Sequence, residues 1–268
     1  MTELGIDLRS RAFLLLDGAA FDAPRFVYEN DDQPEIDYLF LGTRHQAALE
    51  VSPCLVKPSE TSRLWQKQND WQHKAVVVLA EEELPVIAGH LRSLLSVALP
   101  DGGYSYLRFY SPRELRRLML ALNDQERERF SGPIREWLAF QPEGNWRSFR
   151  AGTLQPAMTA SDEGWFALTD RHLEVLAEDA REEFLGRLGR FLSINDQPRL
   201  ARLLQEANGL GFRSEKDVSR YAELAVTHGN RIRLPECQAI LSNLSLPSAA
   251  RLTELDQHLA YGLAQGGA

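Results

Sequence analysis

Six histidines and two cysteines are the residues of this chain whose side chains best serve as metal ligands, bases or nucleophiles. No two of them stand in a His-Glu-x-x-His or Cys-x-x-Cys arrangement, the spacings that bring several ligands to one metal ion. The sequence therefore predicts neither a metal site nor a bound cofactor. The histidines are His45, His73, His90, His172, His228 and His258.

Cys54 and Ser105 are the candidate nucleophiles. Cys54 falls in a short apolar run typical of a strand, where cysteine usually serves as a small core residue. Ser105 lies in a Gly-Tyr-Ser-Tyr-Leu segment, which lacks the second glycine and the directly following helix of a nucleophile elbow. The Asp-Gly-Gly turn before it is too short for a phosphate loop and leads into a strand. We therefore expect no catalytic residue, and a protein that is not an enzyme.

His90 lies on the apolar side of its predicted helix, so we expect a packed and hydrogen-bonded core histidine. His228 ends a predicted helix, where a positive charge interacts favourably with the helix dipole. An enzyme whose active site is dispersed over Asp17, His90 and Arg108 is the least favoured alternative.

Two tryptophans and three leucines are the candidates for contact with another protein. Trp65 and Trp71 are large aromatic side chains of the kind that anchor interfaces. Leu252, Leu255 and Leu259 form an apolar stripe on the last predicted helix. Such side chains lie more often in a core, and that reading stays open for all five.

Composition excludes several classes of protein. The chain has 268 residues, 44% of them hydrophobic and 25% charged, which is ordinary for a soluble globular protein. Its net charge of -8 argues against nucleic-acid binding, which needs a basic face. The first residues lack the apolar core of a secretory signal, and no apolar run approaches the ~20 residues of a membrane helix. Cys54 and Cys237 are too few for a disulfide framework. We expect a cytoplasmic protein without stable membrane insertion.

The best-defined elements lie between residues 85 and 138. Leucines at helical spacing predict a helix, two glycines a turn, and alternating aromatics a strand. Ser111 with Glu114, and Asn123 with Glu126, predict two further helices that begin with capping boxes. The expected elements are a helix over 85–97, a turn over 100–103, a strand over 104–110, a helix from 112 and a helix from 124 to 138.

The flanking segments decide the fold class. Short apolar runs at 12–16, 53–56 and 74–79 predict buried strands, which alternate with helical segments. After a small, polar stretch at 156–164 the sequence is nearly all helical. We therefore predict an α+β protein: a mixed lobe over residues 1–155, with a sheet covered by helices, and an all-helical lobe over residues 165–268.

Five segments in order resemble a known family, the effector chaperones or adaptors of the bacterial type VI secretion system. The resemblance covers about residues 11–140 and includes Asp17, Gly18, Arg108, Tyr110, Ser111 and Pro112. The family pattern reads Arg-Phe-Tyr-Asp-Pro where this chain has Ser111, and both residues suit a helix N-terminus. We expect these residues to be structural, with Arg108 in a salt bridge or hydrogen bond. The segments are LLLDGA (14–19), YLFLGTRHQAALEVSPCLVKPS (38–59), VVVLAEEELPVIAGHLRSLLSVALPDG (76–102), LRFYSP (107–112) and LNDQERERFSGPIREWL (122–138).

The resemblance implies a non-catalytic adaptor that binds a secreted effector or toxin in the cytoplasm and loads it onto the spike protein. The first lobe would recognise a common feature, and the helical lobe would add specificity for the client. The alternative is an immunity-type protein that binds and neutralises a toxin. The sequence leaves the oligomeric state open.

Overall fold

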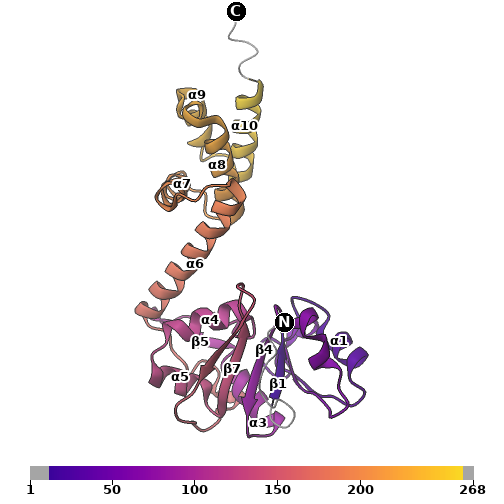
Figure 1. The fold of residues 1–268 in the computed structure, drawn as a ribbon. Coiled ribbons are helices and arrows are strands. Elements are labelled where there is room, and N and C mark those ends of the chain that lie inside the picture. The colour runs from indigo at the N-terminus through magenta and orange to yellow at the C-terminus, as the bar shows by residue number, and fades with distance from the viewer. Residues whose placement is uncertain (1–11, 262–268) are drawn as a thin grey trace, which may run out of the picture. The chain divides into compact units, whose positions relative to one another are not determined.

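The computed structural model describes residues 12–261, and the chain divides into two compact units, Met1–Leu176 and Ala177–Ala268 (Figure 1). The first combines sheets with helices and the second is helical, which confirms the predicted α+β class. Within the described part of the chain, no helix combines the length and apolarity needed to cross a membrane.

A six-stranded antiparallel sheet forms the centre of the first unit (Figure 1). Its order is β2-β3-β1-β4-β7-β8. β1 and β4 are buried at every position, as expected for continuous apolar strands covered on both faces. A separate ribbon pairs β5 with β6. The strands are β1 (Ala12–Leu16), β2 (Glu35–Tyr38), β3 (Cys54–Lys57), β4 (Ala75–Ala80), β5 (Ser96–Ala98), β6 (Tyr104–Tyr106), β7 (Ile134–Phe140) and β8 (Trp146–Arg150).

Helices cover both faces of this sheet because its strands carry apolar side chains on each side. One face packs with α3, α4 and α5 into a core that includes Phe109 and Trp137. The other face packs with α1 and Trp71. The helical elements of this unit are α1 (Ala23–Asn30), η1 (Gln46–Val51), η2 (Leu64–Lys67), α2 (Gln68–Trp71), α3 (Leu84–Ser93), α4 (Pro112–Ala121), α5 (Asp124–Ser131) and η3 (Ala160–Asp162).

The second unit has its own apolar core, built from helices with one buried face each. Ser214 caps α8 by accepting from the Asp217 amide at 3.1 Å. α6 begins within the first unit and continues into the second. The elements are α6 (Asp170–Leu192), α7 (Gln197–Gly209), α8 (Glu215–His228), η4 (Gly229–Arg233), α9 (Pro235–Leu241) and α10 (Ser248–Tyr261).

Three predicted elements end earlier than expected. The helix predicted over 85–97 stops at Ser93, and β5 follows; the strand predicted over 104–110 stops at Tyr106. The helix predicted to reach residue 138 stops at Ser131, because Gly132 takes a φ of 55° and the chain enters β7. Pairing of β7 with both neighbours overrides its helix-compatible composition.

The first unit also extends beyond the stretch at 156–164 where we placed the boundary. Phe166 and Leu168 are buried in its core, and both bond through their backbone to Ala98 at 2.9 Å. The compact units divide at Leu176 instead. The small, polar residues before Phe166 are thus a surface segment of the first unit.

Candidate functional site

The family-like residues converge where β1 and β6 end. Asp17 follows β1, and its Oδ2 accepts a hydrogen bond from Nη2 of Arg108 at 2.6 Å. Asp17 is 3% exposed, whereas the side chain of Arg108 is 44% exposed. Burial lowers the pKa of the Arg108 guanidinium, but the charge of Asp17, its hydrogen bond to Arg108 and the two nearby tyrosines together raise the pKa above its usual value. Arg108 therefore forms the salt bridge expected of it and still presents part of its surface to solvent.

Gly18 makes this junction possible. A Cβ on Gly18 would lie 2.1 Å from the carbonyl oxygen of Ser52, closer than any side chain tolerates. The carbonyl precedes β3, so the glycine lets the chain after β1 pass directly against the entry to that strand. Glycine is needed at position 18 because it has no Cβ and allows the two backbone segments to approach closely.

Tyr106 and Tyr110 extend the junction. Their hydroxyl oxygens lie 2.5 Å apart, and the Arg108 guanidinium lies 5.8 Å from the centre of the Tyr110 ring. Burial raises the pKa of both phenols, so they stay neutral near pH 7. The two tyrosines act here as hydrogen-bonding neutral side chains.

Ser111 and Pro112 begin α4 as predicted, but the Ser111 capping box is absent. Ser111 takes an extended N-cap conformation and its side chain makes no cap hydrogen bond. Glu114 lies 3.1 Å from Arg117 instead. The Asn123 and Glu126 capping box is present, with hydrogen bonds of 2.9 and 2.8 Å.

A second polar cluster, which sequence reasoning missed, lies next to Tyr106. Nε2 of His45 is 3.4 Å from Oγ of Ser96 and 3.2 Å from Oε1 of Glu163, and Ser96 donates to the same carboxylate. Arg44 lies 3.2 Å from Oε2 of Glu163. In a catalytic triad one ring nitrogen of the histidine faces the nucleophile and the other faces the acid, but here Nε2 of His45 faces both Ser96 and Glu163. The cluster instead joins the segment before η1, β5 and the end of η3.

These two clusters support one exposed aromatic surface, which we call the β6 surface: Arg44, Tyr104, Tyr106 and Arg108. Tyr104 is 61% exposed and Tyr106 40% exposed. Arg44 lies 5.8 Å from the Tyr104 ring centre, and the His45 ring 4.9 Å from that of Tyr106. Tyrosines flanked by arginines are the composition that protein interfaces favour.

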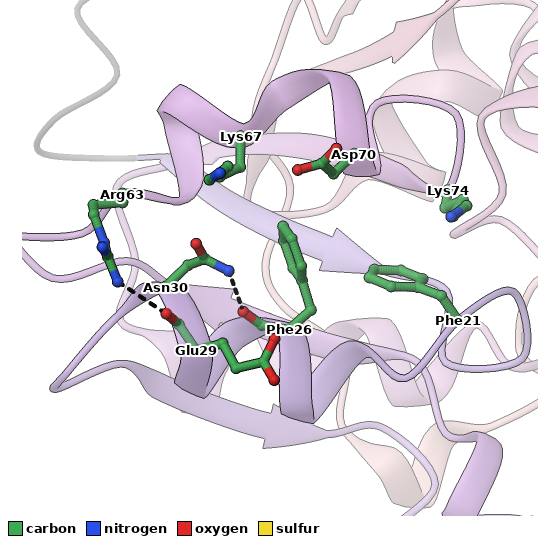
Figure 2. Close-up of a pocket in the computed structure, with 8 residues that line it drawn as sticks. All are labelled: Phe21, Phe26, Glu29, Asn30, Arg63, Lys67, Asp70 and Lys74. Atoms are coloured by element: carbon green, nitrogen blue, oxygen red, sulfur yellow. Dashed lines mark hydrogen bonds between the residues drawn. The ribbon is translucent and has the colours of Figure 1, made fainter.

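A pocket of about 540 Å³ is a second candidate for binding (Figure 2). Phe21 and Phe26 stand edge to face within it, with ring centres 5.7 Å apart. The Lys74 ammonium lies 5.1 Å from the Phe21 ring centre. Arg63 donates to the Glu29 carbonyl at 3.0 Å, away from the two rings. The other residues that line the pocket are Asn30, Lys67 and Asp70. Three basic and two acidic side chains line the pocket, and this small excess of positive charge selects no ligand class.

Four of the five residues predicted to bind a partner are core residues. Trp71 is fully buried and donates from Nε1 to the Leu64 carbonyl at 2.8 Å. Leu252, Leu255 and Leu259 are at most 3% exposed within the second unit. This burial corrects their assignment as contact residues. Trp65 is half-buried and packs on Trp71, with ring centres 5.9 Å apart.

His90 and Cys54 also prove to be core residues, whereas Ser105 is exposed. His90 is fully buried, with Nε2 2.9 Å from the Phe130 carbonyl and Nδ1 3.2 Å from the Met158 amide. Its isolation from solvent excludes the dispersed active site of Asp17, His90 and Arg108. Burial raises the pKa of Cys54 to about 12, which keeps its thiol protonated. No group of three or more His, Cys, Asp or Glu in residues 12–261 could hold a metal ion.

Comparison with known proteins adds one finding. No curated protein and no solved structure matches this chain. Residues 12–129, which contain every family-like residue of the site described above, match the family model described as a domain of unknown function, DUF4123.

Proposed function

We propose that this protein is a cytoplasmic adaptor that binds a type VI secretion effector and loads it onto the spike protein. The observation that carries the proposal is the match of residues 12–129 to DUF4123, a domain associated with type VI effector chaperones. The proposed adaptor acts by binding alone.

The β6 surface is the proposed docking surface of the first unit. It is aromatic at its centre and carries Arg44 and Arg108 at its edge, as a partner-binding surface should. Both arginines pair with carboxylates whose side chains are at most 9% exposed, so the positions of the arginines are set before a partner arrives. Preorganised side chains lose less entropy on binding, which favours affinity.

The helical second unit is proposed to select the client. It has a separate core, so its surface can vary without disturbing the sheet of the first unit. An adaptor needs a contact of at least ~1,000 Å² to hold a client specifically. The first unit would supply the constant part of that contact area, and the second unit the variable part.

Co-purification tests the proposal. The tagged full chain should retain both an effector and a spike protein, and replacing Tyr104 and Arg44 by alanine should lower the amount retained at least several-fold. Tyr28→Ala is the matched control, because Tyr28 is 57% exposed on α1 and should leave retention unchanged.

Two outcomes would overturn the proposal. A chain that retains neither protein is not this adaptor. A chain that retains only a toxin would instead be an immunity protein if its deletion had two effects. Sibling cells would kill the deletion mutant, and delivery of the effector would continue. Equal losses with Tyr28→Ala would remove the β6 surface from the proposal.

A further inference from the structure

β8 is an edge strand whose outer side has no partner among residues 12–261. It pairs only with β7, and Trp137 lies opposite Phe149 and Ala139 opposite Arg147. Gln141 and Ala151 donate across the ends of this ladder at 2.8 and 2.9 Å. Because hydrogen-bonded and non-hydrogen-bonded pairs alternate in antiparallel sheets, the backbone N–H and C=O groups of Arg147 and Phe149 bond to β7. The backbone groups of the three alternate residues, Trp146, Ser148 and Arg150, therefore face outward.

The opposite edge of the same sheet is treated differently. Arg92 donates to the outward-facing carbonyl of Tyr38 at 3.1 Å and also pairs with Asp37. A side chain of α3 thus occupies part of the β2 edge. At the β8 edge the exposed residues are Arg147, Ser148 and Arg150, and none caps the strand's outer backbone.

We propose that this edge pairs in antiparallel fashion with the same edge of a second copy of the chain. The segment Trp-Arg-Ser-Phe-Arg is symmetric in character about Ser148. Pairing Ser148 with Ser148 of the other copy sets Trp146 opposite Arg150 and Arg147 opposite Phe149. Every arginine then faces an aromatic residue, a favourable cross-strand combination.

This register is selected against its neighbours. A shift by two residues in one direction sets Arg147 of one chain opposite Arg147 of the other. Like charges directly opposite one another destabilise a sheet. A shift by one residue would exchange the two faces of the strand. The chosen register is also the one that pairs all five residues of β8.

The charge at the β8 edge also favours pairing with a second copy of the chain over pairing with an acidic strand of another protein. Arg150 already has a carboxylate, with its Nε 3.2 Å from Oε1 of Glu136. Glu136 accepts from Ser148 as well and is 5% exposed. An acidic strand would bring further negative charge next to this buried carboxylate, whereas a second copy brings an aromatic ring.

A pairing of five residues per strand buries less surface than a permanent dimer needs, so we expect a dimer that dissociates on dilution. Sedimentation of the full chain over a concentration series up to ~1 mM measures this. The average mass should rise from that of one chain toward that of two.

Charge at Ser148 tests the register. Ser148→Lys and Ser148→Glu each set like charges opposite one another, so each variant alone should remain a monomer. An equimolar mixture sets lysine opposite glutamate and should form dimers again. Ser161→Lys, an exposed serine on η3, is the matched control and should leave the dimer intact.

Ser148→Pro guards against misfolding of the charged variants. It removes an outward N–H and no backbone hydrogen bond to β7, and it shares the loss of the Ser148 side-chain bond to Glu136 with the charged variants. It should therefore give a folded monomer with an unchanged circular dichroism spectrum. A wild-type chain that stays monomeric over the whole series overturns the proposal, as does a dimer that persists in Ser148→Pro. A monomer that binds an acidic strand at β8 would assign the edge to another protein and also overturn it.

Discussion

Asp17 accepts a hydrogen bond from Arg108 at 2.6 Å across 91 positions of sequence, and this contact ties the end of β1 to the segment that begins α4. The carboxylate is buried and the guanidinium is half-exposed. Removing the arginine would leave a buried charge without its partner, which costs more than removing an exposed pair.

We therefore predict that Arg108→Ala lowers the free energy of unfolding by about 1–3 kcal/mol. Urea unfolding followed by circular dichroism measures the change. Arg25→Ala is the control: its pair with Glu29 is exposed on α1, so the expected loss is below about 1 kcal/mol. Equal losses in the two variants would show that burial of Asp17 contributes nothing.

Gly18 gives the second prediction. Gly18→Ala places a Cβ 2.1 Å from the Ser52 carbonyl oxygen, so the backbone must shift, and we expect a loss of about 1–3 kcal/mol in the free energy of unfolding. Gly209→Ala is the matched control, since nothing lies within 4 Å of its Cβ position. Alanine at this helical position should be neutral or stabilise by up to about 1 kcal/mol. Urea unfolding that finds no difference between the two variants would contradict the close approach at Gly18.

Local sequence signals predicted the elements that depend on neighbouring residues. Asn123 and Glu126 form their capping box, and the valines of β4 form a buried strand, because both outcomes follow from nearby side chains. β7 was missed: its arginine, glutamate, leucine and alanine also suit a helix, and its strand conformation depends on partner strands far along the chain. The Gly132-Pro133 pair was the available signal for the break.

The site divides in the same way. The family-like residues marked Asp17 and Arg108, and a salt bridge was expected of Arg108, but its partner could not be read from the sequence. The contact of His45 with Glu163 spans 118 positions and carries no motif. The buried leucines of α10 show the converse difficulty. An apolar stripe has the same spacing whether it packs inside the unit or contacts a partner.

His90 gives a prediction about pH. Burial lowers its pKa, and the neutral ring both donates to the Phe130 carbonyl and accepts from the Met158 amide. In the unfolded chain the pKa of histidine is about 6.5. Below that pH the unfolded state binds the proton first, so the free energy of unfolding should fall as the pH drops from 7 toward the folded pKa.

His90→Gln should flatten this slope, even though the variant is less stable at every pH. His73→Gln is the control, because His73 is exposed at the surface and its loss should preserve the slope. Urea unfolding at several pH values compares the three proteins. An unchanged slope in His90→Gln would assign the acid sensitivity to other groups.

The cysteines should be unreactive in the folded protein. Cys54 is fully buried with a pKa raised to about 12, and burial also raises the pKa of Cys237. Since the thiolate is the reactive form, iodoacetamide at pH 8 should modify neither residue until denaturant is added. Mass spectrometry counts the modified sites, and alkylation of Cys237 alone would reveal opening of the second unit.

The position of the boundary gives the last prediction. The first unit includes Phe166 and Leu168 in its core, and Nε2 of His172 lies 3.0 Å from the Glu126 carboxylate. A chain of residues 1–176 should therefore unfold cooperatively on heating, because its core is complete. A chain of residues 1–155 lacks both buried side chains and should lose at least about 3 kcal/mol of unfolding free energy, since each contributes about 1.5–3 kcal/mol. Equal melting temperatures for the two chains would show that residues 156–176 only cover the first unit and are not part of its folding core.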